Sequence, residues 1–170
     1  MIRKLALAML ATGLLATPAL AAEKLKIETS KGCSFEITLR PDLAPNHVKQ
    51  ITKLAKAGFY DGIVFHRVID GFMAQTGDPT GSGMGGSEEP DLKAEFTPEP
   101  YKRGTVGMAR SSDPNSGNSQ FFIMFADGDF LNGQYTVWGQ VDEAGMACVD
   151  KIERGEPPAN PDKMVKVTVE

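Results

Sequence analysis

The segment FHRVIDGFMAQTGD (Phe65–Asp78) contains two short runs rich in apolar residues on either side of Asp70-Gly71. Short apolar runs bounded by turn signals are typical of buried β-strands, and an Asp-Gly pair is a common turn. We therefore expect strands at Val64–Val68 and Phe72–Thr76. Because the turn between them is short, the two strands should lie close together.

The same pattern of short strands and turns continues through most of the chain. Ser30-Lys31-Gly32 is typical of a hairpin turn, and Asn132-Gly133 is a second strong turn signal. Together with the two strands above, this pattern predicts eight strands. The other six lie at Leu25–Thr29, Ser34–Leu39, Thr105–Ala109, Phe121–Phe125, Tyr135–Val141 and Val165–Glu170.

Two segments have the periodicity of helices. Pro45–Ala57 begins with a proline that suits the first helical position and ends before Gly58, and Gly145–Arg154 ends before a glycine. Two helices among eight strands do not alternate as a parallel βαβ fold requires. We expect an all-β fold, a closed eight-stranded antiparallel β-barrel capped by two α-helices, because closure leaves no exposed edge. The long irregular segment Gly77–Gly104 is of a kind that usually serves function.

The N-terminus has the three-part pattern of a secretory signal peptide. Arg3 and Lys4 precede an apolar run, and Ala19-Leu20-Ala21 closes it with small residues. We expect a signal peptide at 1–21 and one domain at 22–170. No later apolar stretch is long enough to span a bilayer, so the sequence predicts an exported, most simply periplasmic, protein without stable membrane insertion.

Composition excludes several classes of function. The 170 residues carry a formal charge of −4 and include 41% hydrophobic and 24% charged residues, which is typical of a soluble globular protein. An acidic balance argues against binding to nucleic-acid phosphates. The stretch Gly81–Gly86 fits G-x-G-x-x-G, but Glu88, Glu89 and Pro90 follow it where a dinucleotide site needs a helix. We interpret it as a flexible glycine loop.

Two cysteines and two histidines limit redox, metal and nucleophilic chemistry. Cys33 continues the inward positions of a strand and Cys148 lies on the second predicted helix. An exported protein can form a disulfide, but the sequence does not supply its geometry, and we favour buried free thiols. No ligand spacing accompanies them, so we expect no metal and no cofactor. His47 is expected to face solvent, which leaves His66 without a nucleophile to serve.

Two segments combine apolar residues with hydrogen-bonding residues. In the first, alternation places Arg67 on the face opposite to Val68, close to Phe72, Met73 and Gln75 after the turn. The second runs from Gly107 to Ile123. Together they predict an apolar pocket with one cation and one carboxamide at its edge, which suits a proline ring whose amide is held and polarised. Spacing alone equally allows aromatic core residues and a surface salt bridge for the arginine.

At these residues the chain resembles the cyclophilin family of peptidyl-prolyl isomerases, and in particular its exported bacterial members. Phe65–Asp78, Ser119–Ile123 and the glycine-rich Gly77–Gly86 carry the resemblance, which extends from about Leu25 to the C-terminus. It implies the barrel described above and catalysis of X-Pro rotation in proline-containing exported polypeptides, without metal or cofactor. The alternative is a proline-peptide binding module or chaperone that has lost catalysis.

The resemblance also implies roles for individual residues. Arg67 is the implied catalytic residue, which hydrogen-bonds toward the prolyl nitrogen. Phe130 stands where many members have tryptophan, Tyr135 where they have histidine and Arg110 where they have asparagine. The Arg110 change matters least if that residue acts through its backbone, whereas the Phe130 and Tyr135 changes alter hydrogen bonding at the rim and imply weak cyclosporin binding. The implied substrate-binding residues are Phe72, Met73, Gln75, Ala109, Arg110, Gln120, Phe122, Phe130, Leu131 and Tyr135.

Overall fold

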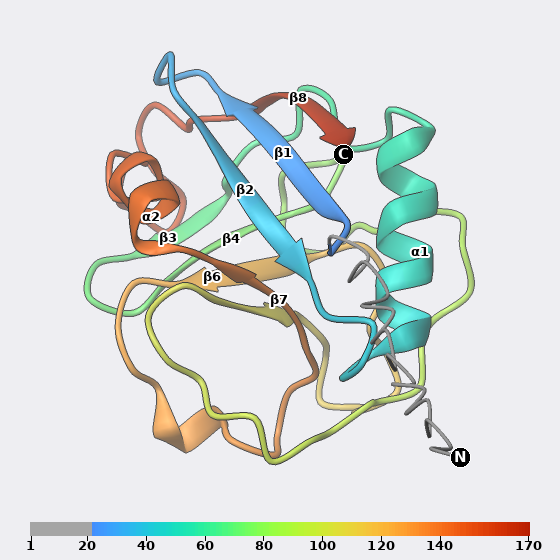
Figure 1. Cartoon of the computed structure of the whole chain (residues 1–170). Coiled ribbons are helices and arrows are strands. Elements are labelled where there is room, and N and C mark those ends of the chain that lie inside the picture. Colours follow the sequence, from blue (N-terminus) through green and yellow to red (C-terminus); the bar gives the residue numbers. More distant parts are fainter. Residues whose placement is uncertain (1–21) are drawn as a thin grey trace, which may run out of the picture.

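The computed structural model of the protein describes residues 22–170, so the predicted signal peptide at 1–21 lies outside the described residues. Eight antiparallel strands form one sheet in the order β3-β4-β6-β5-β7-β2-β1-β8 (Figure 1). The strands are β1 (Lys24–Thr29), β2 (Ser34–Leu39), β3 (Arg67–Ile69), β4 (Met73–Thr76), β5 (Thr105–Met108), β6 (Phe121–Met124), β7 (Val137–Val141) and β8 (Met164–Val169).

The hairpin of β1 and β2 shows how the pattern of the sequence becomes a core. Ile27 lies opposite Phe35, and both side chains are buried on the inner face of the sheet. Gly32 adopts a φ of 72° in the predicted turn, a conformation that glycine reaches without steric cost. Alternate residues of both strands therefore join the large apolar cluster, as the period of two predicted.

The expectation of a closed barrel is wrong, because the sheet is an open half-barrel. Its edge strands, β3 and β8, share no ladder. The segments beside them meet only in isolated bridges, Val68 with Gly155 and Val64 with Lys163. The predicted strand at Val64–Val68 accordingly begins only at Arg67. Prolines in the facing segment, residues 155–161, lack the N–H groups that a continuous ladder would need.

Two α-helices flank the curved sheet at opposite ends, and side chains of both join the same apolar cluster (Figure 1). α1 spans Pro45–Lys56, close to its predicted bounds. α2 spans Glu143–Val149, earlier than predicted, because the carboxylate of Asp142 accepts a hydrogen bond from the backbone N–H of Gly145 and caps the helix start. A short 3₁₀ helix, η1 (Asp129–Leu131), was not predicted, and it precedes the Asn132-Gly133 turn.

The prediction that His47 faces solvent is wrong, since its side chain is 2% exposed. Its Nδ1 lies 2.6 Å from a carboxylate oxygen of Glu95. The same carboxylate accepts the backbone N–H groups of Asn46 and His47 in the first turn of α1. Ala44 at the N-cap has no side-chain oxygen, so a distant carboxylate satisfies these donors and holds the histidine inward.

Cys33 and Cys148 form a disulfide, so our preference for free thiols is also wrong. α2 packs against β2 and brings the two Cα atoms to 5.9 Å, within the range that a bridge requires. The bond ties Cys33, the residue before β2, to α2 across 115 positions of sequence.

Within residues 22–170 no helix combines the length and the hydropathy needed to cross a membrane. The same part of the chain contains no group of three His, Cys, Asp or Glu side chains arranged to hold a metal ion.

Candidate active site

The site is built on three neighbouring strands of the sheet. Arg67 on β3 lies opposite Gln75 on β4, and Gln75 lies opposite Phe122 on β6. Directly opposed residues of antiparallel strands project from the same face, so these three side chains form one row. Val68, the neighbour of Arg67, is buried in the core on the other face, as alternation predicted.

The row borders a groove with a volume of about 500 Å³. Met73, Phe122 and Leu131 are buried beneath it and form its apolar floor. The lining of this groove includes every predicted site residue except Gln120, and it also includes Gln134, which was not predicted. The lining residues are Arg67, Phe72, Met73, Gln75, Ala109, Arg110, Phe122, Phe130, Leu131, Gln134 and Tyr135.

A buried tyrosine that the sequence analysis did not identify supports this floor. The ring of Tyr101 stacks on Phe122 with their centroids 5.7 Å apart, and burial raises the pKa of its hydroxyl. Gly107 leaves room for both rings, because a Cβ there would lie 2.6 Å from the Phe122 ring and 2.5 Å from the tyrosine oxygen. Tyr101 lies in the irregular segment, where no periodicity marks a residue as core.

Arg67 lies at the edge of the groove with a side chain that is 43% exposed. Its Nε donates to Oε1 of Glu156 at 2.9 Å, and its Nη1 donates to Oε1 of Gln75 at 3.3 Å. The arginine therefore combines the two positions that spacing left open, an ion pair and the edge of an apolar pocket. Sequence reasoning missed Glu156, which is 89 positions away.

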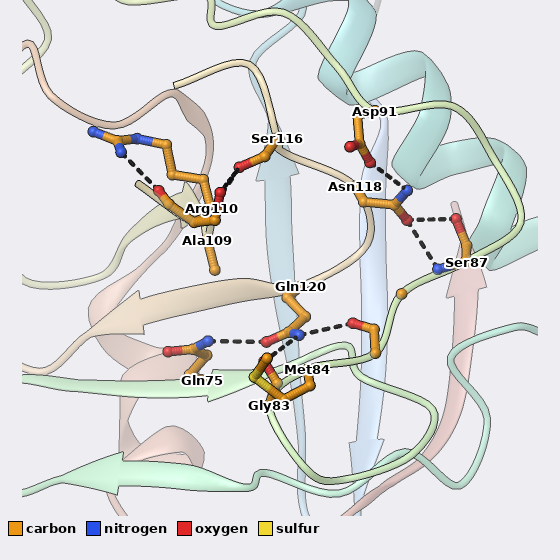
Figure 2. A pocket seen from close by; sticks show the side chains of 13 residues that line it. Gln75, Gly83, Met84, Ser87, Asp91, Ala109, Arg110, Ser116, Asn118 and Gln120 are labelled. Carbon is orange, nitrogen blue, oxygen red and sulfur yellow. Dashed lines mark hydrogen bonds between the residues drawn. The ribbon is translucent and has the colours of Figure 1, made fainter. Parts of the chain in front are cut away.

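The carboxamides continue the hydrogen bonding into a second cavity of about 460 Å³ (Figure 2). Gln75 Nε2 donates to Gln120 Oε1 at 3.0 Å, and Gln120 Nε2 donates to the carbonyl oxygens of Gly83 and Gly85. Gln120 thus lies in this second cavity, which shares Gln75, Ala109 and Arg110 with the first. The two cavities form neighbouring parts of one extended depression.

The glycine loop, Gly81–Gly86, forms a wall of the second cavity and is anchored by Asp78. The buried carboxylate of Asp78 accepts the N–H groups of Gly83 at 2.6 Å and Gly85 at 3.1 Å, and also the N–H and hydroxyl of Thr80. Burial opposes ionisation, but these hydrogen bonds outweigh it and lower the pKa of Asp78 to about 2. Donors that would bind a phosphate are therefore already engaged.

His66 lies beneath this loop, and burial lowers the pKa of its imidazole. A Cβ on Gly83 would lie 3.5 Å from the imidazole ring, so the loop covers it closely. The histidine projects away from the face that carries Arg67 and does not line either cavity. It therefore has no direct place in the chemistry of the groove.

Aromatic side chains form the rim of the groove. Phe130 is 70% exposed and its ring lies 5.5 Å from that of Phe72. The guanidinium of Arg110 lies 4.4 Å from the centre of the Tyr135 ring, and it also donates to the carbonyl of Gln134. Such a cation–π contact holds the arginine against the wall instead of across the opening.

Comparison with known proteins points to one family. The family model described as cyclophilin type peptidyl-prolyl cis-trans isomerase/CLD matches residues 24–169. A probable peptidyl-prolyl cis-trans isomerase of Brucella suis is 58% identical over 150 residues, which cover 79% of this chain and 76% of that protein. A peptidyl-prolyl cis-trans isomerase of Helicobacter pylori is 42% identical over 133 residues, covering 76% of this chain and 80% of that protein.

Comparison with solved structures points to the same family as these sequence relatives. A cyclophilin from Hirschia baltica superimposes with a TM-score of 0.77 at 32% identity, covering 85% of this chain and 73% of that one. A cyclophilin type peptidyl-prolyl cis-trans isomerase of Cryptosporidium parvum, determined in the presence of the dipeptide Ala-Pro, superimposes with a TM-score of 0.78 at 28% identity. That comparison covers 86% of this chain and 98% of the other.

Proposed function

The chain belongs to the cyclophilin-type peptidyl-prolyl cis-trans isomerase family, and we propose that Arg67 accelerates rotation about an X-Pro bond bound in the groove. The observation that carries this proposal is the row formed by Arg67, Gln75 and Phe122. It sets a guanidinium and a carboxamide beside an apolar floor. A proline ring can bury its methylene groups on that floor while polar groups reach the adjacent amide.

The chemistry requires only that the twisted amide be stabilised more than the planar one. Rotation is slow because amide resonance must be broken, at a barrier of about 18–20 kcal/mol. In the twisted state the prolyl nitrogen becomes pyramidal and regains a lone pair. A guanidinium N–H directed at that nitrogen stabilises the twisted state selectively, which is the condition for catalysis. Arg67 suits this role because arginine stays protonated at any working pH.

The carboxamide of Gln75 orients the substrate. One of its N–H groups donates to Gln120, which leaves the second N–H for the carbonyl of the residue before proline. The residues further toward the substrate N-terminus then enter the second cavity beside Ala109 and Arg110. The apolar floor excludes water, so both hydrogen bonds act in a medium of lower dielectric constant.

We further propose that the natural substrates are exported polypeptides and that the enzyme acts in a periplasm. The signal-peptide pattern of residues 1–21 supports this location. The Cys33–Cys148 disulfide supports it independently, because such bonds persist mainly in oxidising compartments.

Replacement of the arginine tests the mechanism. Arg67→Ala should lower kcat/KM for an X-Pro peptide by roughly 10²–10³, the usual effect of removing one preorganised donor. Arg67→Lys should also be poor, since an ammonium lacks the planar fork. Phe122→Ala should instead raise KM as well as lower turnover. The measurement is isomerisation of a short X-Pro peptide.

Arg154→Ala is the matched control, because this arginine stacks on Phe125 outside the groove. It should retain wild-type kcat/KM, and circular dichroism checks that every variant is folded. A folded Arg67→Ala protein within threefold of wild type would remove the mechanism. Such a result would favour the proline-peptide binding module over the catalyst at this groove.

A further inference from the structure

We propose that Glu156 is a positioning residue, which holds the guanidinium of Arg67 in the orientation that isomerisation needs. The inference rests on the proposed catalytic role of Arg67. Glu156 Oε1 accepts the Nε–H of the arginine at 2.9 Å. It is the one carboxylate within salt-bridge distance of Arg67 in the part of the chain that the structure describes.

The position of the hydrogen bond on the guanidinium matters. Glu156 takes the Nε–H and Gln75 takes one N–H of Nη1, so two separate points of a rigid plane are held. The remaining N–H groups of Nη1 and Nη2 are left for a prolyl nitrogen. The carboxylate therefore orients the arginine without competing for the donors that would act on the substrate.

Without this carboxylate the arginine would be poorly held. Its bond to Gln75 is 3.3 Å long, and the side chain is 43% exposed. A long side chain with a single weak anchor samples several rotamers in water. Fewer of these rotamers would direct an N–H group at the substrate, so turnover should fall although the binding floor stays intact.

Backbone hydrogen bonds place Glu156 beside Arg67 independently of the ion pair. Its neighbour Gly155 exchanges two backbone hydrogen bonds with Val68, each of 2.8 Å, at the seam between the two edges of the sheet. Val68 directly follows Arg67 in β3. Glu156 and Arg67 therefore lie side by side because their neighbours are bonded, and removal of the carboxylate should leave this bridge in place.

The carboxylate has little to contribute to folding. Both side chains are substantially exposed, at 43% for the arginine and 54% for Glu156, and exposed ion pairs stabilise proteins weakly. A role in orientation therefore predicts that turnover and stability separate in variants. Loss of the glutamate should reduce kcat and leave the midpoint of thermal unfolding unchanged.

The test measures kcat and KM separately for an X-Pro peptide. Glu156→Ala should lower kcat by about three- to fivefold, the upper part of the range that an exposed ion pair supplies, with KM within about twofold of wild type. Glu156→Gln should keep more than half of the wild-type kcat, since an amide oxygen still accepts the Nε–H. Glu143→Ala, which breaks an exposed glutamate–arginine pair with Arg103, is the matched control and should behave as wild type.

Double variants show whether Glu156 acts through the arginine. In an Arg67→Ala background, Glu156→Ala should cause no further loss. A wild-type kcat in Glu156→Ala, equal losses in the Ala and Gln variants, or an undiminished effect in the Arg67→Ala background would each overturn the role of Glu156. If Arg67→Ala itself stays within threefold of wild type, the proposed mechanism fails instead.

Discussion

The rim and the floor of the groove use aromatic residues in different ways. Phe122 is buried against Tyr101 and is fixed from below, whereas Phe130 is 70% exposed and its ring packs beside that of Phe72 at the rim. A phenyl ring at the rim offers apolar surface but no hydrogen-bond donor. Ligands that need a hydrogen-bond donor at this position should therefore bind weakly. A proline peptide, which needs only the apolar surface here, should still be turned over.

Cyclosporin tests this rim. We expect weak inhibition of the wild-type enzyme and an improvement of about two- to tenfold in Phe130→Trp, the effect of one added hydrogen bond of ~0.5–1.5 kcal/mol from an indole N–H. The measurement is the inhibition constant, with kcat/KM in the absence of drug as the control. Equal inhibition of the two proteins would show that this hydrogen bond has no part in drug binding.

Asp78 gives the glycine loop its shape. Ten glycines of the described chain have positive φ, and Gly81 and Gly83 of the loop are among them. A loop of this composition is intrinsically mobile, but the carboxylate of Asp78 gathers three backbone N–H groups, from Thr80, Gly83 and Gly85. The buried carboxylate of Asp78 therefore opposes the predicted flexibility of the loop. The wall of the second cavity depends on this carboxylate.

Asp78→Asn should weaken the anchoring of the glycine loop. The new NH₂ group faces backbone donors, so we expect the free energy of unfolding to fall by about 1–3 kcal/mol at pH 7 and KM for longer peptides to rise. The pKa of about 2 lies below the ordinary value of 3.8, so the native state binds fewer protons than the unfolded state. The stabilisation that the ionised Asp78 carboxylate gives is present above about pH 4 and is lost as the pH falls toward 2.

Urea unfolding at pH 7 and at several points between pH 4 and 2 measures both effects. Asp61→Asn serves as a comparison, because that carboxylate also has a lowered pKa but bonds Lys166 and the backbone N–H of Val167 at β8, not the glycine loop. If the free energy of unfolding depends on pH as steeply in Asp78→Asn as in wild type, the loss of stability at low pH does not come from Asp78.

The disulfide and the predicted export belong to the protein as a whole. We expect the protein from its native host to begin at Ala22 or Glu23 and to contain an oxidised Cys33–Cys148 pair. Closing a loop of 115 residues restricts the unfolded chain, so reduction should lower the free energy of unfolding by up to about 5 kcal/mol. Intact mass before and after reduction, with alkylation, measures processing and bridging together.

The double variant Cys33→Ser/Cys148→Ser is the control and should unfold identically with and without reductant. A native mass that includes Met1–Ala21 would contradict export. Cysteines that alkylate without prior reduction would contradict the bridge.

Local patterns of sequence were sufficient for most of the elements. The alternation in Leu25–Thr29 and Ser34–Leu39, the proline at the start of α1 and the turn at Gly32 all act within a few residues, so strands, helix and turn were predicted close to their observed bounds. The roles suggested for Arg67 and Gln75 came from the resemblance of a contiguous motif. Their strand alternation then required Arg67 to project away from the core.

Contacts between distant segments came only from the folded structure. Glu156 lies 89 positions from Arg67, Glu95 lies 48 positions from His47, and Cys148 lies 115 positions from Cys33. No periodicity links such residues, because their proximity depends on how helices and irregular segments pack against the sheet. The open seam between β3 and β8 has the same origin. Hydrophobic alternation states which face of a strand is buried, but not whether the last strand finds a partner.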